Sequence, residues 1–338
     1  MPNQGMYTGA LKVVPRAGTR PVSGLPGAGG SRYFKVPAAL QSAARSFLES
    51  GSVSGCSLRQ AASVVFVRDG AQGLETLLTY RPAASPLGVV AFPGGPVVAT
   101  DADPVPWVGP APTQWQGVLQ DTDPGITHAA VVAAIREAFE ETGVLLAGAN
   151  DMSTVELTDG LDQMEARQLI ADGAKTMSEY LVKRGLKLRT DLLRPLARWQ
   201  SPDFRHQRYD IRYFACAVPV GQKFTLLKGR GVWGEWVNVR ELLATAGQSW
   251  LGDRIGVAET RGLTLEELLT PGVLCILEGM AKPSTAVSFL AQKRKVEVKK
   301  AEIVEVDGEY MLTFTSPSTP GTWEKCATKL YGATREMQ

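Results

Sequence analysis

Residues 136–146 read Arg136-Glu137-Ala138-Phe139-Glu140-Glu141-Thr142-Gly143-Val144-Leu145-Leu146. On a helix, positions i, i+3 and i+4 share one face, so Glu137, Glu140 and Glu141 point the same way. Two carboxylates about 5–6 Å apart repel by about 3 kcal/mol at an effective dielectric near 20. Hard divalent cations such as Mg²⁺ relieve that repulsion and prefer oxygen ligands. The stretch therefore predicts a metal site. The alternative is a solvated acidic face on which Arg136 pairs with Glu140.

The residues that flank this stretch predict that it ends a helix. Thr127 can cap the start of the helix, and Gly143 can take the left-handed conformation after its end. An apolar stripe at helical spacing is formed by Val131 or Val132, Ile135 and Phe139.

A second motif lies upstream, where residues 89–95 read Val-Val-Ala-Phe-Pro-Gly-Gly and predict an apolar strand that breaks into a turn. Together with residues 136–144, this motif resembles the Nudix hydrolase family, whose box is written G-x5-E-x7-R-E-U-x-E-E-x-G-U with U apolar. Gly95 stands at the box glycine, and Asp101 stands where the family has a glutamate. The seven-residue spacer is 34 residues long here, from 102 to 135, so the chain carries an insertion of 27 residues.

The resemblance implies a hydrolase that cleaves a pyrophosphate bond with the help of Mg²⁺ or Mn²⁺. It implies that Glu140 and Glu141 bind the metal and that Glu137 is either a ligand or the base for the attacking water. Gly95 is expected to supply backbone near the metal.

Two further residues are expected to support the cluster. Arg136 would orient one of its carboxylates through an ion pair and so belongs with Glu137 and Glu140 to the catalytic set. Asp101 has a shorter side chain than the family glutamate. It is therefore expected to act either as an accessory acid or as a structural partner of the helix.

Residues 77–95 partly resemble the signature of coenzyme A-cleaving Nudix enzymes, LLTxR(S/A)x3Rx3Gx3FPGG. Leu77 to Arg81 and Phe92 to Gly95 match it, whereas Pro82 replaces Ser or Ala and the second arginine is missing. The wider layout, with residues 199–202 and 208–214, resembles the peroxisomal coenzyme A diphosphatase-type branch. Coenzyme A or acyl-coenzyme A is therefore the favoured substrate. The alternatives are ADP-ribose or a dinucleotide, and a non-catalytic ligand-binding regulator with the same fold.

Four residues are candidates for contact with the base or phosphate of a nucleotide-type substrate: Arg81, Trp199, Arg208 and Arg212. For the last three, the alternative is strand packing in the core with arginines at the surface.

Alternating strand and helix patterns across residues 58–250 predict an α/β fold, a Nudix-type α/β/α sandwich with a mixed sheet. We expect three segments along the chain. Residues 1–52 would form a basic, Gly- and Pro-rich tail followed by a short helix, residues 53–255 the Nudix domain, and residues 256–338 an α+β appendage.

The sequence also predicts local features within these segments. Residues 62–68 and 74–81 are expected to pair as a hairpin through a turn at Asp69-Gly70. Residues 161–185 are expected to form two helices that break near Gly173. Strands over 296–306 and 309–315 would flank a hairpin turn at Asp307-Gly308.

The insertion, residues 96–125, lacks periodicity and is expected to be a long loop. Trp107 and Trp115 would pack against the body of the domain rather than stay exposed. Because both ends of the loop lie next to the predicted metal site, we expect it to select substrate. A short Gly-Ser bridge over 102–124 would then leave the fold intact.

The composition limits the classes of binding partner that are expected for this chain. The 338 residues are 44% hydrophobic and 21% charged, which is typical of a globular protein. The net charge of +2 produces no strong electrostatic field that would attract nucleic acid or a membrane. We therefore expect a small-molecule partner, no specific nucleic acid and no membrane, and leave a homodimer open. The longest apolar run, 129–135, is too short to span a bilayer, and no signal peptide is recognised, so a cytoplasmic location is expected.

Overall fold

The computed structural model describes residues 31–36, 40–51, 57–81, 90–156, 161–227 and 229–315. The chain divides into two compact units. Unit 1 draws on residues 1–56, 201–206 and 300–338, and unit 2 on residues 57–200 and 207–299. The carboxylate stretch lies in unit 2, and each unit is described by itself.

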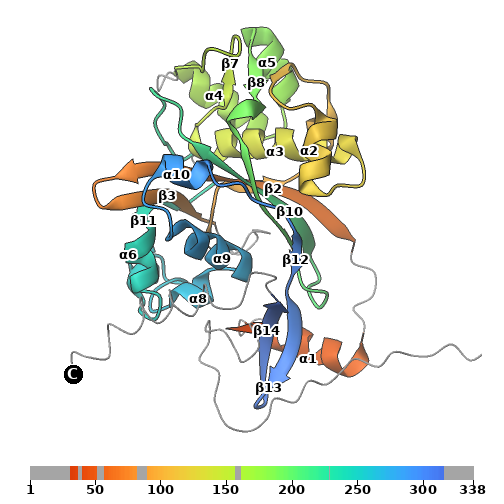
Figure 1. The fold of residues 1–338 in the computed structure, drawn as a ribbon, viewed down its shortest axis with the longest axis vertical. Helices are drawn as coiled ribbons and strands as arrows, with labels where there is room; N and C mark the ends of the chain where they lie inside the picture. The colour runs from red at the N-terminus through yellow and green to blue at the C-terminus, as the bar shows by residue number, and fades with distance from the viewer. Residues whose placement is uncertain are drawn as a thin grey trace, which may run out of the picture. The chain divides into compact units, whose positions relative to one another are not determined.

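Unit 2 is built on an eight-stranded sheet (Figure 1). Its strands are β2 (Leu58–Gly70), β3 (Gly73–Tyr80), β4 (Val90–Ala91), β5 (Gly94–Pro96), β9 (Arg194–Gln200), β10 (Arg208–Ala217), β11 (Trp233–Asn238) and β12 (Val298–Lys300). Six strands follow the order β11-β3-β2-β10-β9-β12, while β4 pairs with β3 and β5 with β2. Strands β2 and β10 run parallel, and β2 is antiparallel to β3 and β5, so the sheet is mixed.

Strands β2 and β3 form the hairpin that their apolar residues and polar Gly-rich turn predict. Gly70 pairs with Gly73, so the turn falls at Ala71 and Gln72, slightly later than the predicted Asp69-Gly70. Val64 of β2 and Leu77 of β3 are fully buried in the main core.

Helices cover both faces of the sheet (Figure 1). One face carries α2 (Pro112–Leu119), α3 (Pro124–Thr142), α4 (Leu161–Ala171) and α5 (Met177–Arg184), and the other carries α6 (Val239–Ala244) and α9 (Pro271–Met280). Unit 2 also contains the short helices α7 (Trp250–Ile255), α8 (Leu265–Leu268) and α10 (Ala286–Leu290). The predicted α/β/α sandwich with a mixed sheet is confirmed.

The acidic stretch lies on α3, which begins earlier than predicted. Asp123 is the cap, because its carboxylate accepts hydrogen bonds from two N–H groups of the first turn at 2.7 and 3.3 Å. Pro124 follows at the first helical position, where the missing N–H costs nothing. Thr127 is therefore not the cap. It lies inside the helix, and its hydroxyl donates to Asp121 at 2.7 Å.

The end of α3 is as predicted. Gly143 has φ 76° and donates its N–H to the carbonyl of Phe139 at 2.9 Å. The apolar stripe packs into the core between α3 and the sheet, where Val131, Ile135 and Phe139 are fully buried.

The insertion, residues 96–125, is structured. It contains η2 (Ala99–Ala102), β6 (Trp107–Val108) and α2, and its last residues already belong to α3. Strand β6 joins a small sheet of order β6-β8-β7, with β8 (Lys187–Arg189) and β7 (Ala147–Gly148). The expectation that both tryptophans pack is confirmed. Trp115 is buried edge-on against Phe214, and Trp107 stacks on His128 with ring centroids 5.2 Å apart.

The sequence predicts the break between α4 and α5 but does not predict α9. Helices α4 and α5 are separated at Gly173 (φ 71°), as expected. Helix α9 was not anticipated. It packs closely on β9, because a Cβ added at Gly272 would lie 3.1 Å from the indole of Trp199.

Unit 1 contains α1 (Gln41–Ser50) and a three-stranded sheet of order β1-β14-β13. Its strands are β1 (Ser31–Lys35), β13 (Glu302–Val306) and β14 (Glu309–Thr315). Asp307 and Gly308 have φ 51° and 79° and form the predicted hairpin turn between β13 and β14. The strand expected over 296–306 is instead split between β12 and β13, which lie in different sheets.

The two units do not follow the three-segment division at residues 52 and 255. Because β1 pairs with β14, the described ends of the tail and of the C-terminal segment belong to one unit, while residues 256–299 belong to unit 2. Residues 1–30 of the tail and 316–338 lie outside the described residues.

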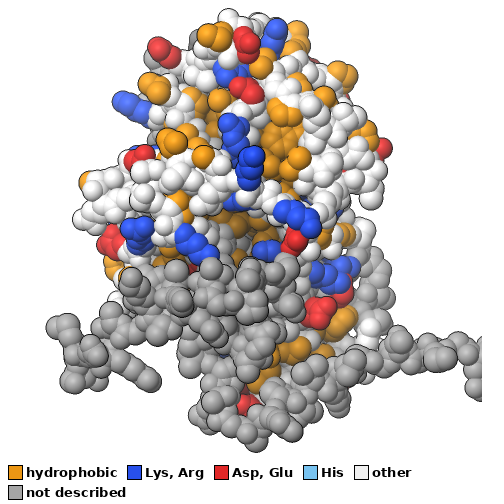
Figure 2. Space-filling view, viewed as in Figure 1, with side chains coloured by type: hydrophobic (Ala, Val, Ile, Leu, Met, Phe, Trp, Pro, Cys, Tyr) orange, Lys and Arg blue, Asp and Glu red, His pale blue; other side chains and the backbone are white. Residues whose placement is uncertain are grey.

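Charged side chains are spread over the face shown in Figure 2, with Asp and Glu interspersed among Lys and Arg. Within the described ranges, no helix combines the length and the apolar character that a bilayer crossing requires.

Candidate active site

The three predicted carboxylates lie at the C-terminal end of α3, where they line a cavity of about 520 Å³. Gly94 and Gly95, which follow the turn after β4, border the same cavity, and so does Arg81 directly after β3. The remaining walls come from Pro96 and residues 98–100 of the insertion, from Arg136, from residues 170, 171, 173 and 175–177 around the α4–α5 turn, and from Arg230. The cavity therefore combines acidic groups, cations and a glycine-rich turn.

Arg136 ties the carboxylates together. Its Nη1 donates to Glu137 at 2.9 Å and to Glu140 at 2.8 Å, and its Nη2 donates to the carbonyl of Pro96 at 2.9 Å. Its Nε and Nη2 bind the two oxygens of Asp101 at 2.7 and 2.9 Å. All five N–H donors are used. Burial alone would lower the pKa of Arg136, but the three surrounding carboxylates raise it, so the arginine stays charged.

Asp101 lies behind this arginine and does not line the cavity. Its side chain is 1% exposed, and besides Arg136 it accepts the N–H of Val98 at 2.8 Å. Of the two roles expected for Asp101, this placement favours the structural partner, because both of its oxygens already serve the arginine that orients the cluster.

Glu141 pairs with Arg81, whose Nη2 donates at 2.6 Å and also donates to the carbonyl of Phe92 at 2.9 Å. The N–H of Gly94 approaches the same carboxylate oxygen at 3.4 Å. Burial nevertheless raises the pKa of Glu141 to about 7, because Arg81 only partly offsets the desolvation and Glu137 adds repulsion.

Glu140 has one carboxylate oxygen that is buried without a hydrogen bond in the described part of the chain. Its Oε1 accepts from Arg136, but its buried Oε2 receives no hydrogen bond from the described residues. The Nη2 of Arg230 lies 3.1 Å from that oxygen, close enough for an ion pair but without the geometry of a hydrogen bond. Burial and the nearby Glu137 raise the pKa of Glu140, against the opposing effect of Arg136.

The glycine pair is required by close packing. A Cβ at Gly95 would lie 2.4 Å from the carboxylate of Glu137 and would displace it. A Cβ at Gly94 would lie 2.4 Å from the backbone carbonyl of Ala62 in β2. Close packing against the backbone of β2 therefore requires glycine at Gly94, whereas a Cβ at Gly95 would force the Glu137 carboxylate to move.

These donors fit a divalent cation. Three carboxylates crowd one end of a helix, two of them have raised pKa values, and one buried oxygen lacks a hydrogen bond. Across the part of the chain that the structure describes, no group of three Asp, Glu, His or Cys side chains has the arrangement needed to hold a metal ion. Arg136 and Arg81 hydrogen-bond to oxygens of all three carboxylates, and a cation bound there would share these oxygens.

The raised pKa of Glu141 predicts a pH dependence of stability in metal-free protein. A carboxyl whose pKa rises on folding from 4.5 to about 7 favours the folded state while it is protonated, and this contribution is lost as pH rises from about 4.5 through 7. A pKa difference of about 2.5 (about 7 minus 4.5) corresponds to about 3 kcal/mol. We expect Glu141→Gln to gain stability of that order relative to wild type over this window.

Urea unfolding of both proteins in EDTA, at several pH values from 4.5 to 8, measures the difference. Because all other titrating groups are common to the two proteins, they largely cancel. A difference that stays constant over the window would contradict the prediction.

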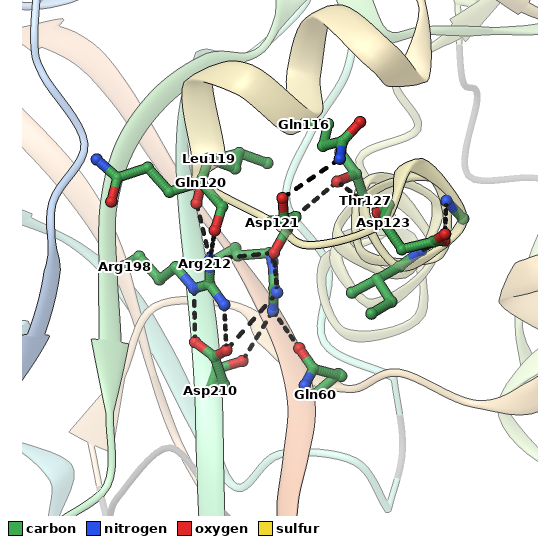
Figure 3. A network of polar contacts seen from close by, with 12 residues as sticks. Gln60, Gln116, Leu119, Gln120, Asp121, Asp123, Thr127, Arg198, Asp210 and Arg212 are labelled. Carbon is green, nitrogen blue, oxygen red and sulfur yellow. Dashed lines mark hydrogen bonds and ion pairs between the residues drawn. The ribbon is translucent and has the colours of Figure 1, made fainter.

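The other three candidate substrate residues do not border the cavity. Trp199 is buried in β9 beneath α9, with Lys299 Nζ 5.6 Å from its ring centroid. Arg208 lies at the start of β10. Arg212, also in β10, is buried in a polar network with Asp121 (Figure 3). The structure thus brings Arg81 to the carboxylates, but not these three.

Two cations of the cavity were missed from the sequence, Arg230 and Lys175. Lys175 lies in the α4–α5 turn, and Arg230 lies between Gly229 and Gly231 ahead of β11. A Gly-Arg-Gly sequence is a weak signal for a site residue, because no fixed spacing relates it to the carboxylate stretch on α3.

Comparisons with known proteins agree with this architecture. No protein-family model matches the sequence, and no curated protein matches it either. The structure is similar to the crystal structure of a Nudix hydrolase from Alicyclobacillus acidocaldarius, with a TM-score of 0.53 and 23% identity over 71% of this chain and 98% of that one. A MutT protein from Bacillus halodurans (TM-score 0.33, 10% identity, 78% and 100% covered) and a MutT Nudix hydrolase from Burkholderia pseudomallei (0.27, 16%, 66% and 97%) are more distant. The first similarity shows that the chain has the Nudix fold.

Proposed function

We propose that the chain is a hydrolase that cleaves the pyrophosphate bond of nucleoside diphosphate-linked compounds with the help of Mg²⁺ or Mn²⁺. The observation that carries the proposal is the buried cluster of Glu137, Glu140 and Glu141 in a cavity that also holds four cationic side chains. Carboxylates suit the cations, and Arg or Lys side chains suit the phosphates that those cations accompany.

The residues divide the chemistry among them. Glu140 and Glu141 would hold the cation, with Glu137 as a third ligand or as the base. When bound, the cation supplies a Lewis acid that neutralises charge on the phosphate oxygens. As the base, Glu137 takes a proton from the attacking water while the new P–O bond forms and the bridging P–O bond breaks. Because Gly95 has no Cβ, the Glu137 carboxylate can keep its position beside the turn.

Arg136 acts through the carboxylates. Because Asp101 fixes its Nε and Nη2, its Nη1 is aimed at Glu137 and Glu140 together. This keeps the two carboxylates side by side despite their repulsion. A non-catalytic regulator would have no need of this arrangement, which favours catalysis over the binding-only alternative.

Coenzyme A or an acyl-coenzyme A is the favoured substrate. The partial signature at residues 77–81 and 92–95 supports this choice, since Arg81 and the glycine pair border the cavity. Apolar side chains of Val98, Ile170 and Met177 border it as well, and they suit a long, weakly polar group attached to a diphosphate. Residues 82–89 of the signature lie outside the described residues.

A substrate panel tests the function. Coenzyme A, an acyl-coenzyme A, ADP-ribose and a dinucleoside polyphosphate are each incubated with Mg²⁺ or Mn²⁺, and products are identified by mass spectrometry. We expect coenzyme A to yield 3′,5′-ADP and a phosphopantetheine fragment. Turnover of ADP-ribose or the dinucleotide far above that of both coenzyme A substrates would favour the runner-up. Binding without turnover of any compound would favour the regulator.

A further inference from the structure

Three arginines contact the carboxylate cluster among the described residues, and Arg230 differs from the other two. The side chains of Arg136 and Arg81 are 7% and 8% exposed, and each donates several hydrogen bonds. The side chain of Arg230 is 38% exposed. Its Nη2 reaches both Glu140 Oε2 and the carbonyl of Ala171 at the end of α4. Arg230 therefore bridges the cavity from a glycine-flanked turn.

The charge balance shows what Arg230 contributes. Asp101, Glu137, Glu140 and Glu141 bring four negative charges when ionised, and Arg136 and Arg81 bring two positive ones, which leaves an excess of two (4 − 2). Arg230 offsets one of these charges, whereas a divalent cation would offset both.

The contact is poorly aligned. Glu140 Oε2 is buried and lacks a hydrogen bond although Arg230 lies 3.1 Å away. Because Arg230 is 38% exposed, water can solvate it and the carbonyl of Ala171 when it leaves, and a divalent cation would replace its charge beside Glu140. A hard cation would satisfy this oxygen better than a guanidinium that cannot align with it.

We propose that Arg230 is an exchangeable counter-cation: it neutralises Glu140 in the metal-free protein, gives up this place to the divalent cation, and then binds a phosphate of the substrate. This inference rests on the proposed function, because it takes a divalent cation to bind the carboxylate cluster and names Arg230 as the residue that the cation displaces. Arg230 lines the cavity, and a guanidinium binds phosphate oxygens through paired N–H groups. Metal loading would thereby prepare the site for an anionic ligand.

The test compares Arg230→Gln with Arg254→Gln. Arg254 is a suitable control, because it is 45% exposed, pairs with Glu235 at 2.6 Å and does not border the cavity, so both variants lose one positive charge from an ion pair. Mn²⁺ binding is measured by calorimetry without substrate. Binding of methylenediphosphonate, whose P–C–P bridge resists hydrolysis, is then measured on Mn²⁺-loaded protein.

We expect Arg230→Gln to bind Mn²⁺ about five- to tenfold more tightly and the diphosphonate at least about tenfold more weakly, while Arg254→Gln changes neither by more than about twofold. Arg230→Lys retains the charge and should keep Mn²⁺ affinity near wild type, which separates the charge effect from misfolding. Unchanged or weaker Mn²⁺ binding by Arg230→Gln, or unchanged diphosphonate binding, would overturn the inference.

A second variant separates this outcome from failure of the proposed function. Mn²⁺ binding that is lost in Glu140→Gln places the titrated ion at the cluster. If wild-type protein bound no Mn²⁺ that depends on Glu140, the proposed function would fail together with the inference. If that binding is intact and Arg230→Gln leaves it unchanged, the role of Arg230 fails alone.

Discussion

Replacing Glu140 with glutamine is expected to lower kcat by a factor of about 10²–10⁴, equivalent to about 3–5 kcal/mol of transition-state stabilisation. Glutamine keeps the size of the side chain but removes the negative charge that would hold the cation. The effect should fall on kcat rather than on folding, because Arg136 retains Asp101 and Glu137 as partners. Steady-state kinetics on the preferred substrate, at saturating Mg²⁺ or Mn²⁺, measure the loss.

Glu165→Gln is the matched control, since Glu165 is an exposed carboxylate on α4 that does not border the cavity. Its kcat should stay within about twofold of wild type. Glu140→Gln should unfold at the same denaturant concentration as wild type or a higher one, because repulsion with Glu137 is relieved. Near wild-type turnover of Glu140→Gln would remove Glu140 from the catalytic set.

The parts of the fold that the sequence predicts are those governed by neighbouring residues. Periodicity locates α3 and the β2–β3 hairpin, and Gly143 and Asp307-Gly308 mark conformations that depend on local backbone geometry. The start of α3 shows the limit of such rules. Thr127 and Asp123 are both acceptable caps, and in the structure the Thr127 hydroxyl instead donates to Asp121 within a buried network.

Arg136 could be predicted from its i,i+4 spacing to Glu140, but the partners from other elements depend on tertiary structure. Arg81 lies 60 residues before Glu141, and Arg230 lies 90 residues after Glu140 (230 − 140). The sequence singles out Arg81 as a candidate substrate residue but not as the partner of Glu141, and nothing local distinguishes Arg230 among the 36 Lys and Arg residues. Asp101 illustrates the same point, since its residue type allowed two roles and its position behind Arg136 favours one of them.

The insertion was predicted to be a replaceable loop, and the structure argues against this. Asp121 at the end of α2 accepts hydrogen bonds from Arg212 of β10, and Arg198 of β9 donates to the carbonyls of Leu119 and Gln120 at 2.9 and 2.6 Å (Figure 3). A Gly-Ser bridge over 102–124 would remove these groups and the cap of α3. The insertion is therefore part of the core of unit 2.

Asp121→Ala is accordingly expected to destabilise the protein by about 3–5 kcal/mol. The side chains of Asp121 and Arg212 are each 1% exposed, and Arg212 would keep Asp210 and Gln60 as its polar neighbours. Asp210 already pairs with Arg198, so one carboxylate would face two buried guanidinium groups. Removing one partner of a buried ion pair leaves a charge without compensation, which is more costly than losing the attraction between the partners.

Asp123→Ala is the matched control, because it deletes another carboxylate of the same segment and removes only the exposed cap of α3. Its expected cost is about 1 kcal/mol. Urea unfolding monitored by tryptophan fluorescence gives both values, and a smaller denaturant dependence in Asp121→Ala would show that the insertion has already opened in the folded state. Equal costs for the two variants would mean that the buried network does not hold the insertion on the sheet.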